Sequence, residues 1–132
     1  MKSKILSFLT VGLCLLAFGC ASFNANTYNA ENLAADTARA STHAFNQYYQ
    51  TATNGASPEQ LAKLNGYRDQ VYAADQQLSK TLATVEGLRL AYVENSADTN
   101  KTAVQIGIAS LSEQSGNIVA LVKSFISNPS TK

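Results

Sequence analysis

Apolar side chains recur every three or four residues over most of the chain, a spacing that places them on one face of an α-helix. The longest series lies in residues 58–94 and resembles the seam of a coiled coil. Its members are Leu61, Leu64, Tyr67, Val71, Ala74, Leu78, Leu82, Val85, Leu88 and Tyr92. The pattern therefore predicts one long helix over these residues.

Two shorter series flank it and predict helices over residues 28–53 and about 98–127. The first is built mainly of small side chains, so a neighbouring helix can approach it closely: Ala34, Ala38, Ser41, Phe45, Tyr48 and Ala52. The last is built mainly of aliphatic side chains: Val104, Ile108, Leu111, Ser115, Ile118, Val122 and Phe125.

Short polar segments separate the three predicted helices. In the first, Ser57 and Gln60 have the spacing of a capping box, and Pro58 suits the first helical position. In the second, either Ser96 or Asp98 can act as the N-cap.

Short connections between amphipathic helices favour neighbours that run in opposite directions. The sequence thus predicts an all-α fold for residues 28–127, an antiparallel three-helix up-down-up bundle with a long central helix. Pairing the helices outward from each loop places Phe45 near Phe125 at one end, and Leu33 near Val85 at the other. Residues 128–132 follow as a C-terminal tail.

The first residues of the chain show another pattern. Lys2 and Lys4 precede an uncharged, mostly apolar run from Ile5 to Phe18. This run is too short to cross about 30 Å of hydrocarbon as a helix. It is typical of the apolar part of a secretory signal peptide.

The run ends in the sequence LLAFGC, residues 15–20. This ending resembles the lipobox of bacterial lipoproteins, in which small or apolar residues and then Gly or Ala precede a cysteine. The resemblance implies that residues 1–19 are a signal peptide, and that Cys20 becomes the diacylated N-terminus. Two acyl chains attach a protein stably to a membrane. The alternative is an ordinary cleaved signal with a spare cysteine.

The same resemblance bears on location. It implies a lipid-anchored, extracytoplasmic protein, with residues 20–27 as a lipid-anchored tether. Because Ala21 rather than Asp follows the cysteine, the resemblance implies the periplasmic face of the outer membrane if the host is Gram-negative.

Composition and charge narrow the functional classes. Charged residues make up 14% of the 132 residues, with 10 basic and 9 acidic side chains. Lys2 and Lys4 belong to the predicted signal peptide, so 8 basic and 9 acidic side chains remain after it. This near-neutral balance carries no electrostatic signature of nucleic-acid binding, so we expect no nucleic-acid partner.

The inventory of reactive side chains favours a protein that is not an enzyme. His43 is the single histidine and no cysteine follows Cys20, so a zinc site of His and Cys ligands cannot form. The carboxylates are scattered singly and no glycine-rich phosphate loop occurs. We therefore expect no catalytic residue, no metal and no cofactor.

Two tyrosines, Tyr49 and Tyr72, fall outside the predicted seams. Exposed tyrosines are enriched at protein interfaces, so they are candidate interface residues, although isolated aromatic side chains are also ordinary on surfaces. We expect the partner to be an unidentified envelope protein.

Two functions remain open at this point. The first is a membrane-anchored lipoprotein acting through protein contacts, as an assembly accessory or as an exclusion or immunity factor of the kind that phages and plasmids encode. The alternative is a structural spacer between outer membrane and peptidoglycan that forms homo-oligomers. A terminal Lys132 resembles the end of Braun-type lipoproteins, but their basic-aromatic ending is missing here.

Overall fold

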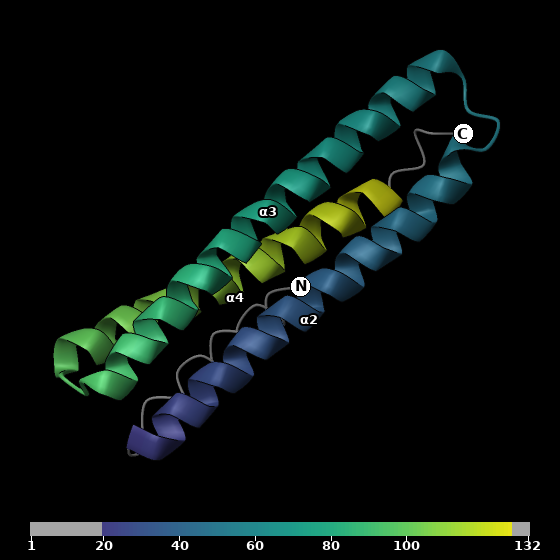
Figure 1. Ribbon diagram of the computed structural model, residues 1–132. Helices are drawn as coiled ribbons and strands as arrows, with labels where there is room; N and C mark the ends of the chain where they lie inside the picture. The colour runs from purple at the N-terminus through teal and green to yellow at the C-terminus, as the bar shows by residue number, and fades with distance from the viewer. Residues whose placement is uncertain (1–19, 128–132) are drawn as a thin grey trace, which may run out of the picture.

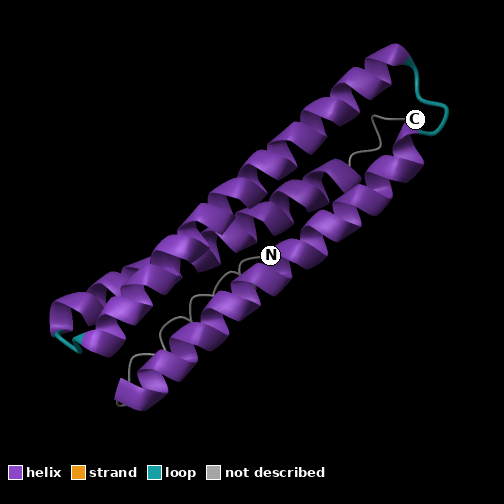
Figure 2. Cartoon of the chain, viewed as in Figure 1, coloured by secondary structure: helices purple, strands orange, loops and turns teal. Residues whose placement is uncertain are grey.

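Three long helices form the body of the protein. The computed structural model describes residues 20–127, which comprise α2 (Cys20–Thr53, 34 residues), α3 (Pro58–Glu94, 37 residues) and α4 (Asp98–Ile126, 29 residues). Each helix packs against both others, and they lie side by side (Figure 1). The two loops lie at opposite ends of the bundle (Figure 2). The predicted all-helical fold is confirmed for the described residues, which contain no strand.

Several predicted features lie outside the described residues. These are the signal peptide of residues 1–19, nearly all of the lipobox, and the tail of residues 128–132. Among the described helices, none combines the length and the hydropathy that crossing a membrane requires.

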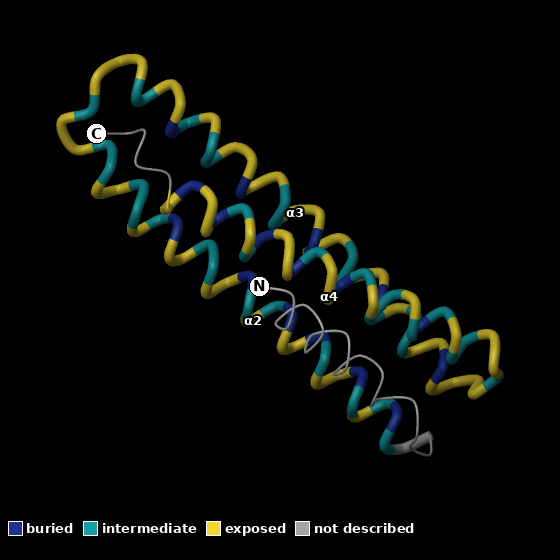
Figure 3. The backbone as a smooth tube through the Cα atoms, turned by 180° about the vertical axis from the view of Figure 1, so that it is seen from behind, coloured by how far each residue is buried: buried dark blue, intermediate teal, exposed yellow. Residues whose placement is uncertain are grey.

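A buried stripe runs along each helix (Figure 3), and in α3 its members are seven residues apart. In α3 the buried residues are Leu64, Val71, Leu78, Val85 and Tyr92. In α4 they are Val104, Leu111, Ser115, Ile118, Val122 and Phe125. Seven residues make almost two helical turns, so a heptad spacing keeps the stripe facing the neighbouring helices. Every seam position predicted from the sequence is buried or partly buried.

The start of α2 differs from the prediction. The helix begins at Cys20 rather than at residue 28, so residues 20–27 are helical and do not form an extended tether. Phe23 is 3% exposed and packs edge-on against Tyr92, with ring centroids 4.8 Å apart. The sequence pattern did not show this because Phe23 is the one large apolar side chain in the segment, and a single residue defines no period.

The loop between α2 and α3 has the predicted chemistry. The Gln60 backbone N–H donates to Ser57 Oγ at 3.3 Å, and the Ser57 N–H donates to Gln60 Oε1 at 2.8 Å. Both bonds of the capping box are therefore present. Gly55 takes a positive φ of 78° in the preceding turn, a conformation that glycine adopts without steric cost.

The loop between α3 and α4 is held differently from the prediction. Ala97 is the N-cap residue of α4 and no side chain caps it, so neither Ser96 nor Asp98 has that role. Instead, Asn100 Nδ2 donates to the Asn95 carbonyl at 2.8 Å. This bond crosses the loop and stabilises the reversal of the chain.

The core has two parts. The larger extends from the α2–α3 loop past the middle of the bundle, and its Phe45 and Phe125 rings are 6.2 Å apart, as the sequence predicted. The smaller consists of Phe23, Tyr92 and Val104. We name the two ends of the bundle the Phe45 end and the Phe23 end.

Leu33 was expected at the Phe23 end, but it is 62% exposed. The inner face of this part of α2 carries Glu31, Ala34 and Ala38 instead. Leu33 is one residue away from Ala34, which turns its side chain by about 100° to the outside of the bundle.

Candidate functional site

A cluster of charged side chains lies between α2 and α3, close to the Phe23 end. Glu31 is the one charged residue that is buried among those described, with 7% of its surface exposed. Its Oε2 lies 3.7 Å from Arg89 Nε on α3. Buried charges are costly unless they are paired, and this pair offsets only part of the cost of burying a charged Glu31.

Arg89 has a stronger partner than Glu31. Its Nε and Nη2 donate to the two carboxylate oxygens of Glu86 at 2.8 and 2.6 Å, and its Nη1 donates to Asn24 Oδ1 at 2.7 Å. The guanidinium also lies over the Tyr28 ring, 5.5 Å from its centroid. Arg89 thus links α3 to three side chains of α2, since Asn24, Tyr28 and Glu31 all belong to that helix.

Glu31 is consequently left under-satisfied. Its Oε1 atom is buried and has no hydrogen-bond partner among the described residues. Burial and the neighbouring Glu86 raise the pKa of the Glu31 carboxyl, the positive charge of Arg89 opposes both, and the net result is a shift from 4.5 to about 7. Hydrogen bonds from Arg89 lower the pKa of Glu86. Near neutral pH, Glu31 therefore exchanges a proton while Glu86 keeps its negative charge.

This arrangement offers no site for a small molecule. The cluster sits within a packed helix interface, where Arg89 and Tyr28 cover it. A shallow, open depression of about 120 Å³ lies elsewhere between α2 and α3, lined by Ala35, Ala38, Arg39, Asp75, Leu78, Ser79 and Leu82. Pockets that bury small ligands usually measure about 300 Å³ or more.

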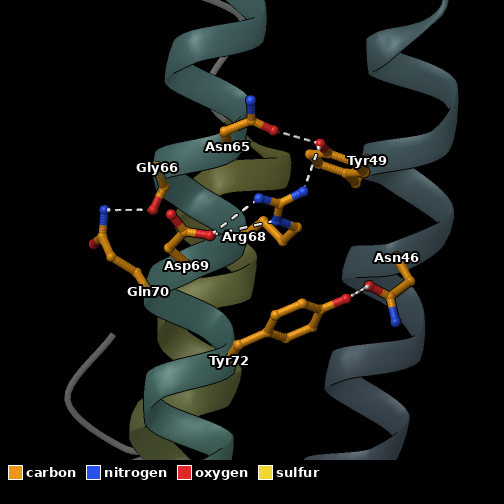
Figure 4. A network of polar contacts seen from close by, with 8 residues as sticks. All are labelled: Asn46, Tyr49, Asn65, Gly66, Arg68, Asp69, Gln70 and Tyr72. Atoms are coloured by element: carbon orange, nitrogen blue, oxygen red, sulfur yellow. Dashed lines mark hydrogen bonds and ion pairs between the residues drawn. The ribbon is translucent and has the colours of Figure 1, made fainter.

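The two tyrosines predicted to form an interface lie on the same side of the bundle, across α2 and α3 (Figure 4). Tyr49 is partly buried, and its hydroxyl donates to Asn65 Oδ1 at 2.5 Å. The Arg68 guanidinium lies over the Tyr49 ring, 5.6 Å from the centroid, and its Nη1 donates to the Tyr49 hydroxyl at 3.4 Å. Tyr49 therefore helps to hold α2 against α3.

Tyr72 is more accessible, with 43% of its surface exposed. Its hydroxyl donates to Asn46 Oδ1 at 3.5 Å, which is a long bond between exposed groups. Of the two, Tyr72 is the side chain that a partner could reach. Their role as an interface stays a prediction.

The other residues considered from the sequence are His43, Cys20 and possible metal ligands. His43 is exposed on α2, in agreement with its polar surroundings in the sequence. Cys20 is the first residue of α2. Within the part of the chain that the structure describes, no three His, Cys, Asp or Glu side chains are grouped so that they could hold a metal ion.

The charged cluster was not found from the sequence, although a signal was present. Glu31 precedes Ala34 by three residues and Ala38 by seven, so it continues the buried stripe of α2 toward the N-terminus. A carboxylate on a seam predicts a partner on the facing helix. Arg89, one residue after Leu88 on the seam of α3, was available for that role.

Comparison with known proteins gives no further guide to function. No protein-family model matches the chain, and neither a curated protein nor a solved structure matches it.

Proposed function

We propose that the chain is a non-enzymatic lipoprotein of the bacterial cell envelope, anchored through acyl chains on Cys20 and acting through contacts with another envelope protein. The observation that carries this proposal is the sequence LLAFGC at residues 15–20, which ends in Cys20. The cysteine that ends the lipobox-like sequence is also the first residue of α2. Three residues later, Phe23 is already part of the core.

This geometry has a mechanical consequence. A lipid on Cys20 would be joined to the bundle without an intervening flexible segment, so the bundle would stand directly on the membrane surface.

The proposal includes the antiparallel up-down-up order of the helices. It is supported by the aromatic contacts, since Phe23 near the start of α2 meets Tyr92 near the end of α3, and Tyr67 near the start of α3 stacks on Phe125 at 4.0 Å.

Acylation is tested by paired cysteine substitutions in the full chain. Cys20→Ser should abolish incorporation of a palmitate analogue and leave residues 1–19 uncleaved. Cys14→Ser is the matched control and should change neither, because Leu13 before it is too bulky for a lipobox. A wild-type protein that is unlabelled and free of membranes would refute the proposal.

The rival function, an oligomeric spacer between outer membrane and peptidoglycan, requires helical seams that close between subunits. Within one chain, Leu64, Val71 and Leu78 are already exposed by 1% or less. The middle of the α3 seam is therefore already covered within one chain, which favours a monomeric protein that contacts partners through its outer surface. Light scattering on the detergent-solubilised protein measures its mass and so distinguishes a monomer from an oligomeric spacer.

The partner determines which envelope role applies, whether assembly accessory or exclusion or immunity factor. Crosslinking in intact cells, followed by mass spectrometry of the captured protein, identifies it. Tyr72 is the position to carry the crosslinker, since it is exposed and lies outside the seams.

A further inference from the structure

Four large apolar side chains are exposed near the tip of the Phe23 end, and the exposed Leu33 lies further along α2. The four come from all three helices and are Tyr28 (52% exposed), Leu90 (50%), Val93 (57%) and Ile106 (67%). We call these four residues the apolar collar. Single exposed apolar side chains are ordinary on a surface, but these four lie at one end of the bundle, next to the proposed lipid anchor.

Contacts within the bundle place the collar close to Cys20. Leu90 and Val93 lie on either side of Tyr92 in α3, and the Tyr92 ring packs against Phe23. Ile106 lies two residues after Val104, which belongs to the same small core. The start of α2 and the α3–α4 loop lie at the same end (Figure 1).

Helical geometry sets the distance along the bundle. Tyr28 is eight residues after Cys20 in the same helix, which corresponds to a rise of about 12 Å. The other members of the collar lie level with Phe23 or within about two turns of it. The whole collar therefore lies within about 12 Å of the Cys20 backbone along the bundle axis.

We propose that the apolar collar lies in the interfacial layer of the membrane, in contact with lipid headgroups and the upper acyl chains. The inference rests on the proposed acylation of Cys20, which names the membrane as the occupant of this surface. Because α2 is helical from Cys20 onward and Phe23 is fixed in the core, no flexible segment holds the collar away from the lipid. Amphipathic helices that lie in the membrane interface bury their apolar face by about 5–10 Å, a depth comparable with the height of the collar.

Charge near the collar indicates what kind of lipid is involved. Glu94 and Asp98 are exposed beside the α3–α4 loop, whereas the Lys101 ammonium lies over the Phe23 ring, 5.5 Å from its centroid. This mixture gives no strong attraction to anionic lipids. Apolar burial is therefore the driving force, and zwitterionic lipid suffices.

The chain offers a matched pair of positions for a test. It contains no tryptophan, so a single introduced tryptophan reports on its own surroundings. Ile106 in the collar and Ile126 at the other end of α4 are both exposed isoleucines of one helix, about 30 Å apart along its axis. The Ile106→Trp and Ile126→Trp variants of the full chain are purified from membranes and reconstituted into phosphatidylcholine vesicles with brominated acyl chains. Mass spectrometry of the same samples shows whether Cys20 is acylated.

We expect bromine to quench most of the emission of the Ile106→Trp variant and little of that of Ile126→Trp. An acylated, vesicle-bound protein whose Ile106→Trp emission is not quenched would refute the contact between collar and lipid, while acylation of Cys20 would remain supported. Quenching without acylation would support the collar and refute the anchor. Equal quenching of both variants would overturn the proposal, because it would mean that the bundle lies flat on the membrane. A blue-shifted Ile106→Trp emission without quenching would also overturn it, because a protein rather than lipid would then cover the collar.

Discussion

The two ends of the bundle are built on different principles. At the Phe45 end, five aromatic rings meet, since Phe45 and Tyr67 pack on Phe125, and Tyr48 and Tyr49 pack on Phe45. Its polar groups, such as Arg68 and Asp69, remain on the surface. At the Phe23 end the apolar core is smaller, and a buried carboxyl lies beside it.

The two ends therefore differ in how their stability depends on pH. The packing of Phe45 on Phe125 does not depend on pH, because neither ring carries a titrating group. The cluster of Glu31, Glu86 and Arg89 makes the stability of the other end depend on protonation near neutral pH. The responsive end is also the end at which the chain carries Cys20 and the apolar collar.

The largest expected effect comes from removing an aromatic side chain at the Phe45 end. Phe45→Ala should lower the free energy of unfolding by about 3–5 kcal/mol, because the ring is completely buried and its loss leaves a cavity. Phe23→Ala should cost clearly less, since the first turn of a helix can fray around the gap. Urea unfolding followed by circular dichroism measures both, and equal losses would contradict the contrast between the ends.

The second prediction concerns the pH dependence of the Phe23 end. The folded-state pKa of Glu31 is raised from 4.5 to about 7, so the stability that Glu31 contributes is full below pH 4.5 and is lost as pH rises through about 7. The shift corresponds to about 3 kcal/mol. Glu31→Gln should therefore unfold like wild type at pH 4.5 and be more stable by up to that amount at pH 8.

Glu86→Gln is the matched control for this titration. The pKa of Glu86 is lowered by Arg89, so its contribution is present at neutral pH and is lost as the solution becomes acidic. The variant should therefore be less stable than wild type at pH 8. A Glu31→Gln difference that does not change with pH would show that Glu31 has an ordinary pKa.

The third prediction concerns the approach of α4 to α3. A Cβ added at Gly107 would lie 2.6 Å from Val85 Cγ2, whereas one added at Gly116 on the same helix meets nothing within 4 Å. Gly107→Ala should destabilise the bundle by about 1–3 kcal/mol, because the helices must separate. Gly116→Ala should stabilise it by about 0.5–1 kcal/mol. Thermal unfolding distinguishes the two signs, and a stabilising Gly107→Ala would mean that the helices pack less closely there.

The smallest effect is expected at the two tyrosine hydroxyls. Tyr49→Phe removes the bonds to Asn65 and Arg68 and should cost about 1 kcal/mol. Tyr72→Phe should be nearly neutral, since its bond to Asn46 is long and exposed. A binding defect of Tyr72→Phe or Tyr72→Ala without a change in melting temperature would then report a contact with the partner.

Much of this fold can be predicted from sequence because the signals are local. The seam of α3 needs only the period of ten apolar residues, and the start of α3 needs only Ser57, Pro58 and Gln60. The meeting of Phe45 and Phe125 follows from counting residues outward from the loops. None of these inferences requires knowledge of a neighbouring side chain.

The charged cluster and the true start of α2 could not be reached in that way. Phe23 is helical and buried because Tyr92, almost seventy residues later, lies where its ring can pack. Glu31 lies on the inner face of α2 beside Arg89, where burial raises its pKa, and Leu33 lies on the outside. Sequence periodicity alone determined the three helices and most of their inner faces. The tertiary structure alone decided which residues at the Phe23 end are buried, because burial there depends on the partner that each side chain meets.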